Sequence, residues 1–186
     1  MNVEISQKET LLYRTLLALV LIILAAALRI APHPWNLTPV GAMALFSGAV
    51  LKDRRLAFLF PLLALFAGDI FIGLYKIIPI IYASFLISVA IGLWLRDRRT
   101  VARISLATLA GAIQFFFVSN FAVWQFMNTY PHNFSGLVGC YVAAIPLFWN
   151  TLAGDALYAA FLFGGYALAE RFLPALNASR QRASAD

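Results

Sequence analysis

The stretch Leu11–Ala31, LLYRTLLALVLIILAAALRIA, decides the class of fold to which this chain belongs. It is long enough for one helical membrane crossing, which needs about 20 mostly apolar residues. Pro32-His33-Pro34-Trp35 follows it, instead of the small residues of a signal-peptide cleavage site. We therefore expect a retained membrane helix, not a cleaved leader.

The composition of the whole chain agrees with that class. Of its 186 residues, 62% are hydrophobic and only 12% are charged, and a soluble domain of this size could not bury so much apolar surface. The sequence predicts an all-α, polytopic membrane protein. The single cysteine, Cys140, excludes an internal disulfide, and we expect it to be a buried, inert thiol.

Apolar segments divide the chain into six predicted crossings within one transmembrane domain, residues 11–173. The predicted crossings are Leu11–Ala31, Pro39–Leu51, Leu56–Tyr75, Ile77–Leu95, Val101–Phe126 and Asn150–Leu173. The second is short, with Thr38 as its expected N-cap and Pro39 at its first helical position. Gly136–Trp149 is apolar but short and contains Pro146, so it is predicted to be a separate half-helix. Residues 1–10 form an N-terminal segment, and residues 174–186 a polar tail that we expect to be disordered.

The basic residues predict the orientation of these crossings. With the N-terminus inside, twelve of the 14 Lys and Arg residues fall on the inner side, and only Arg29 and Lys76 fall on the outer side. This asymmetry follows the positive-inside rule and predicts that both termini are cytoplasmic. The net charge of +6 is therefore a topology signal, and we expect no nucleic-acid partner.

Four polar residues inside apolar segments fall near the same, outer ends of those segments: Arg29, Asp69, Asn120 and Asp155. An ionisable group at membrane depth costs about 2.5–3.5 kcal/mol on insertion scales, so such residues usually have a role. Asp69 can pair with Arg29 or Lys76 and fasten helices, or it can line a ligand cavity, and both are open. A glycine precedes each aspartate, which should let another backbone approach closely.

Aromatic and amide side chains surround this predicted outer layer. Asn120 and Trp124 share a helical face, and Asn150 lies one turn before Asp155. Aromatic belts at the membrane interface explain such side chains without a ligand, but the added His and Asn residues favour a lid over a pocket. The candidate ligand-binding residues are Arg29, Asn36, Asp69, Lys76, Asn120, Trp124, Tyr130, His132, Asn150 and Asp155.

The sequence shows no enzyme signature. It has no glycine-rich phosphate loop, no zinc-protease motif and no convincing Ser/His/Asp arrangement. His33 and His132 alone are weak evidence for a metal. We expect no catalytic residues, metal or cofactor, and any active transport would need a separate energising partner.

Several motifs together resemble a known family: residues 36–49 (NLTPVGAMALFSGA), Ser119-Asn120, Trp124, residues 136–141 (GLVGCY) and Gly154-Asp155. They are similar to a family of uncharacterised bacterial inner-membrane proteins described as candidate transport proteins. That family in turn resembles the substrate-binding (S) components of energy-coupling-factor vitamin transporters. The resemblance implies a six-helix fold, a vitamin-like ligand held near the outer face, and a transmembrane coupling subunit with ATPases.

One departure from the S components concerns the first helix, where small residues at spacing four dock the coupling subunit. Here Ala27 and Ala31 have that spacing at the outer end, whereas Ala18 is followed four residues later by Ile22. A solitary carrier, which works without a coupling subunit, is therefore also compatible with the sequence. The sequence is also compatible with a structural or assembly protein whose polar residues only fasten helices, and with a membrane enzyme acting on a lipid or quinone.

Overall fold

The computed structural model describes residues 7–29 and 34–173, and this part of the chain folds into six helices without strands. The helices are α1 (Gln7–Leu28), α2 (Val40–Val50), α3 (Arg54–Ile72), α4 (Ile78–Trp94), α5 (Val101–Phe126) and α6 (Phe134–Phe172). Of these, α1, α5 and α6 are long and apolar enough to cross a membrane. The all-helical prediction is confirmed, and the composition and these helices define a membrane protein.

Side chains at the helix starts explain several of the helix boundaries. Asp53 caps α3 by accepting from the backbone N–H of Arg55 at 2.7 Å. Thr100 caps α5 through Arg103, and Asn133 caps α6 through the N–H of Gly136 at 2.8 Å. Each of these residue types is a preferred N-cap, because its side-chain oxygen satisfies an N–H that has no partner in the helix.

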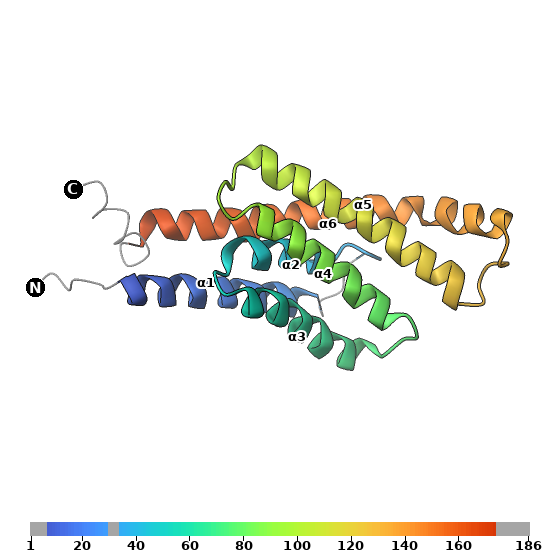
Figure 1. The fold of residues 1–186 in the computed structure, drawn as a ribbon, viewed down its shortest axis with the longest axis horizontal. Helices are drawn as coiled ribbons and strands as arrows, with labels where there is room; N and C mark the ends of the chain where they lie inside the picture. The colour runs from blue at the N-terminus through green and yellow to red at the C-terminus, as the bar shows by residue number, and fades with distance from the viewer. Residues whose placement is uncertain (1–6, 30–33, 174–186) are drawn as a thin grey trace, which may run out of the picture.

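Both segments rich in Lys and Arg, residues 52–55 and 96–99, lie toward one end of the molecule, which we call the basic end (Figure 1). The start of α1 and the finish of α6 point the same way, while the α3–α4 and α5–α6 turns lie toward the opposite end. This arrangement agrees with the charge asymmetry of the sequence. The predicted tail, residues 174–186, lies outside the described residues.

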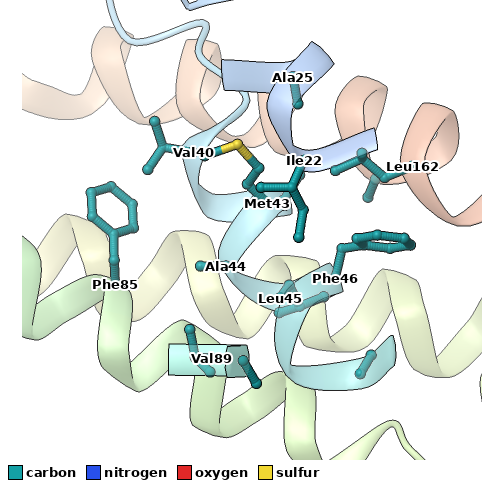
Figure 2. Packing of buried hydrophobic residues seen from close by; sticks show 14 of the residues in the cluster. Ile22, Ala25, Val40, Met43, Ala44, Leu45, Phe46, Phe85, Val89 and Leu162 are labelled. Carbon is teal, nitrogen blue, oxygen red and sulfur yellow. The ribbon is translucent and has the colours of Figure 1, made fainter. Parts of the chain in front are cut away.

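The short helix α2 is the centre of the fold, because it contacts all five other helices. Nine of its 11 residues are buried. At 1.5 Å per residue it is only about 16 Å long, about half the thickness of a hydrocarbon core, and it lies inside the protein. Figure 2 shows Met43 and Phe46 of α2 packed among Ile22 of α1, Leu162 of α6 and Val89 of α4.

Glycines allow α2 to lie directly against α4. A Cβ placed on Gly48 would overlap the carbonyl oxygen of Val89, and one on Gly92 would overlap the carbonyl oxygen of Leu45. The two backbones therefore touch without intervening side chains, an arrangement that small residues permit between membrane helices.

The last helix differs from the prediction. The segment Gly136–Trp149 is not a separate half-helix but the first part of α6, which runs without a break through Pro146 to Phe172. Its 39 residues make it about 58 Å long, nearly twice a hydrocarbon core of about 30 Å. Beyond Pro146, the hydroxyl of Thr151 donates to the carbonyl of Leu147 at 3.0 Å. A bond between residues four apart is one that helical geometry permits.

Two smaller predictions are also wrong. Thr38 does not cap α2, because the N-cap is Pro39 and no side chain of that segment makes the capping bond. The helix that carries Asp69 is shorter than the predicted crossing Leu56–Tyr75. The helix α3 ends at Ile72, and Gly73 follows it with a positive φ of 111°, a conformation that glycine adopts readily.

Candidate functional site

A buried ion pair joins the end of α1 to α3. Nη2 of Arg29 lies 2.6 Å from Oδ1 of Asp69, whose side chain is 0% exposed. The other carboxylate oxygen accepts from the Tyr82 hydroxyl of α4 at 2.7 Å, and Nη1 of Arg29 donates to the Leu65 carbonyl at 3.0 Å. Both charges are thus paired and hydrogen-bonded, which is the condition for burying them at acceptable cost. Of the two partners predicted for Asp69, the structure selects Arg29.

The second aspartate stabilises a helix other than its own. Asp155 of α6 is 5% exposed, and its Oδ1 accepts from the backbone N–H of Ala42 at 3.1 Å. Ala42 lies in the first turn of α2, where the N–H groups lack partners within the helix and the helix dipole favours a negative charge. Gly41 leaves room for this contact, since a Cβ there would overlap the Asp155 carboxylate.

The other end of α2 carries the complementary charge. The guanidinium of Arg96, which follows α4, donates to the carbonyls of Gly48, Leu51 and Lys52 at 2.9, 2.6 and 3.3 Å. Burial and the neighbouring Arg54 lower the pKa of this guanidinium from its usual value. A cation at a helix C-terminus is favoured by the same dipole. The sequence identified Arg96 only as a topology signal, so this contact was not predicted.

The glycines before the two aspartates serve two different neighbours. A Cβ on Gly154 would lie 3.0 Å from the backbone nitrogen of Thr38, so this glycine admits another backbone, as predicted. A Cβ on Gly68 would instead lie 2.6 Å from Nη1 of Arg29. That glycine leaves room for the guanidinium of the buried ion pair, not for a backbone.

A cavity of about 150 Å³ lies between the Arg29–Asp69 ion pair and Asp155, and we call it the Asp155 cavity. Its polar lining comes from Arg29, from Asn36 and Thr38 in the segment before α2, from Tyr75 in the α3–α4 turn, from Ser88 of α4, and from Thr151 and Asp155 of α6. Phe85 and Phe115, whose rings stack with centroids 5.1 Å apart, supply apolar wall. Asp69 does not line this cavity, although its partner Arg29 does.

A polar cluster beside the cavity was not predicted from the sequence. Gln114 of α5 donates to the Ser88 hydroxyl at 3.0 Å and to the Ser84 carbonyl at 3.1 Å. The Ser84 hydroxyl in turn donates to the Gln114 side-chain oxygen at 3.1 Å. These residues are uncharged and lie in apolar segments, so only a search for polar residues of any kind within the crossings would have found them.

The remaining predicted site residues do not line the Asp155 cavity. Asn120 donates to the carbonyl of Phe116 in its own helix at 2.8 Å. Trp124, near the end of α5, donates to the carbonyl of Pro131 at 3.0 Å, and its ring meets that of His132. His132 and Tyr130 lie in the α5–α6 turn. Lys76 is exposed in the α3–α4 turn.

One further predicted residue has a structural role near the cavity. Asn150 donates to the backbone carbonyl of Trp35 at 3.0 Å and so fastens the segment before α2 to α6. Asn36 in that segment has a positive φ of 63°, which asparagine tolerates better than most residues. His33 lies outside the described residues, and among the described residues no group of His, Cys, Asp and Glu could hold a metal ion.

The fold and these contacts define a helical membrane protein with a buried charged network around a short central helix. A family model of unknown function, DUF6580, matches residues 9–176, and the chain belongs to that family. No curated protein and no solved structure matches the chain.

Proposed function

We propose that this protein binds a small, polar, vitamin-like solute within the membrane and transports it. The observation that carries the proposal is the Asp155 cavity, where a guanidinium, a carboxylate, an amide and hydroxyl groups from separate parts of the chain converge. Pockets that bind small molecules combine apolar walls with a few convergent polar groups in this way.

The size and charge of the cavity restrict the solute. About 150 Å³ equals the liquid volume of roughly five water molecules, and it is below the range of about 300–1,000 Å³ typical of drug-sized ligands. The solute would therefore be a compact molecule or one compact part of a larger one. Because Arg29 and Asp155 both line the cavity, a zwitterionic solute suits it best.

Energy for uptake would come from elsewhere. The sequence has no phosphate-binding loop, so active transport requires a separate subunit and ATPases, which is what the resemblance to S components implies. Uptake down a gradient by a solitary carrier needs neither. The proposed location is the bacterial inner membrane, with six crossings and the basic end in the cytoplasm.

The first test is to identify the small molecules that leave the membrane with the protein. We would purify it in mild detergent and analyse bound molecules by mass spectrometry, beside Asn36→Gly and Thr151→Val. Asn36→Gly removes a cavity amide while keeping a residue that tolerates positive φ. We expect a stoichiometric solute in the wild type that is lost in both variants.

Thr15→Val is the matched control for Thr151→Val. The Thr15 hydroxyl donates to the carbonyl of Leu11 in α1 at 2.9 Å, the same type of bond that Thr151 makes to Leu147, and Thr15 does not line the Asp155 cavity. This control should retain the solute. Finding only lipid in every sample, across several growth media, would contradict solute binding.

A structural role is the second candidate function. Asp69 is fully buried with both oxygens bonded, one to Arg29 and one to Tyr82, so it fastens three helices without lining the cavity. If this role is the only one, variants of the cavity residues alter folding but no solute is ever found.

A further inference from the structure

A second, larger cavity opens at the basic end, and we call it the α5–α6 cleft. Its volume is about 850 Å³, and it lies between the first half of α5 and the last half of α6. Figure 1 shows the first turns of α5 diverging from the last turns of α6. Small residues of α6 form one wall: Ala156, Ala160, Gly164 and Ala167.

The lining of the α5–α6 cleft indicates water, not lipid tails. Charged side chains of both signs, Arg96, Asp97, Arg99 and Glu170, line it at the basic end. At its deep end lies Thr108, a residue that is only 6% exposed and whose hydroxyl has no hydrogen-bond partner among the described residues. The oxygen of that hydroxyl is shielded from solvent in this structure, so the cleft ends at Thr108.

The cleft ends where the Asp155 cavity begins. On α5, Ile104 and Thr108 line the cleft, and Gly111 and Phe115 line the cavity. These four residues share one helical face. On α6, Leu152 and Ala156 line the cleft, while their neighbours Thr151 and Asp155 line the cavity. Thr108 and Gly111 are about 4.5 Å apart along the helix axis, so the partition is about one turn thick.

We propose that the α5–α6 cleft is a water-filled vestibule, and that the cleft and the Asp155 cavity are the two halves of one solute path, closed in this structure at the level of Thr108 and Leu152. The proposal rests on the proposed transport function for its solute, a small zwitterion. The inner part of the α6 wall, with Ala156 and Ala160, is small and apolar, so a solute that leaves the cavity meets charged side chains such as Arg99 and Glu170 only at the basic end. The path therefore releases solute at the basic end.

Cysteine accessibility tests the vestibule. In a Cys140→Ala background, single cysteines are exposed to a membrane-impermeant sulfonated methanethiosulfonate, added separately to each side of membrane vesicles. Lys52→Cys and Thr129→Cys, both in exposed turns, identify the basic side and the opposite side. Because only a thiolate reacts, and a thiolate needs water, we expect Ala160→Cys to react from the basic side roughly tenfold faster than Leu157→Cys.

Leu157 is the matched control, since it lies on α6 close to Ala160, is 60% exposed on the protein surface and lines neither cavity. Equal, slow reaction at both positions would show that lipid fills the cleft and would overturn the vestibule.

A second measurement tests the partition. Thr151→Cys, in the Asp155 cavity, should react from the opposite side only. Adding Leu152→Ala or, separately, Thr108→Ala should make it react from the basic side as well, whereas adding Leu157→Ala should not. Size-exclusion chromatography in detergent selects the folded variants. If neither opening variant gives access from the basic side, the two cavities do not form one path.

These experiments measure access of water and need no knowledge of the solute. If they fail while a solute still co-purifies with the wild type, the proposed binding site stands and the proposed path is rejected. Absence of any co-purified solute would instead reject the proposed function.

Discussion

At the scale of single residues, Asp155 shows how a buried charge is used twice. Its carboxylate holds the first turn of α2 through Ala42 and also faces the Asp155 cavity. One oxygen, Oδ1, makes the bond to the helix. The same residue can therefore position the central helix and contact a solute, so tests of binding must be separated from tests of folding.

The contact between Gly41 and Asp155 gives the first prediction. Alanine in place of a helical glycine would normally stabilise a helix by about 0.5–1 kcal/mol, but at Gly41 its Cβ would overlap the Asp155 carboxylate. We expect Gly41→Ala to lower the unfolding temperature in detergent. In an Asp155→Ala background the same substitution should cost much less, because the overlapping group is gone. Equal costs in the two backgrounds would contradict the contact.

The Arg29–Asp69 pair gives the second prediction. Removing one partner leaves a buried, uncompensated charge, which typically destabilises a protein by about 3–5 kcal/mol. We expect Arg29→Met and Asp69→Asn each to be strongly destabilising in thermal unfolding, and the double variant to cost much less than the sum of the two. Tyr82→Phe removes only the hydroxyl bond to Asp69, so it should cost about 1.5–3 kcal/mol at most. Additive costs for Arg29→Met and Asp69→Asn would show that the pair is not coupled.

At the scale of elements, α2 is a helix whose sequence alone would not hold it in place. It is short, has no side-chain N-cap of its own, and has no basic residue in its last turn. Asp155 and Arg96, which lie outside α2, supply the charges that its two ends favour. The central helix is thus fixed in position and direction by residues distant in sequence.

The close contact between α2 and α4 gives the third prediction. We expect Gly48→Ala and Gly92→Ala each to destabilise the protein, because the new Cβ would overlap a carbonyl oxygen of the other helix and neither backbone can move without losing packing. Gly164→Ala is the control, since a Cβ there would meet nothing within 4 Å. It should be neutral or stabilise the protein by up to about 1 kcal/mol. Similar melting temperatures for all three variants would be evidence against the contact.

At the scale of the whole molecule, charge is arranged along one axis. The segments rich in Lys and Arg, the start of α1 and the finish of α6 lie toward the basic end, and the aromatic α5–α6 turn lies toward the other (Figure 1). Arg96 belongs to the charged groups of the basic end, and its guanidinium also donates to the Leu51 carbonyl at the C-terminal end of α2. The same residue thus contributes both to the charge asymmetry and to the tertiary structure.

The fourth prediction concerns topology. We expect reporters fused to the two termini to be active only in the cytoplasm, and a glycosylatable or thiol-labelled site at Thr129 to be accessible only from outside. Reversed labelling, or termini on opposite sides, would refute both the orientation and the even number of crossings. Replacing Arg54 and Arg55 with Gln is the companion variant, since it weakens the charge asymmetry while leaving Arg96 in place.

The amino-acid sequence was sufficient to predict the class of protein and most helix positions. For Asp69 it left open an ion pair with Arg29 or Lys76 and a place in a cavity lining, and the structure shows the pair with Arg29. The length and hydropathy of a segment suffice to predict a membrane helix, because a chain in an apolar solvent must satisfy its backbone hydrogen bonds within each segment. A lone carboxylate in an apolar segment has few possible partners of opposite charge, so the sequence could limit the candidates to Arg29 and Lys76.

The continuity of α6, the role of Asp155 and the two adjoining cavities follow from long-range packing, which the local sequence does not reveal. A proline removes one backbone hydrogen bond, and whether the helix continues through it depends on its neighbours, which local sequence does not contain. Asp155 meets Ala42 across 113 positions of sequence, and its partner is a backbone N–H that no residue type reveals. The α5–α6 cleft exists where those two helices diverge, and that depends on crossing angles set by the packing of all six helices.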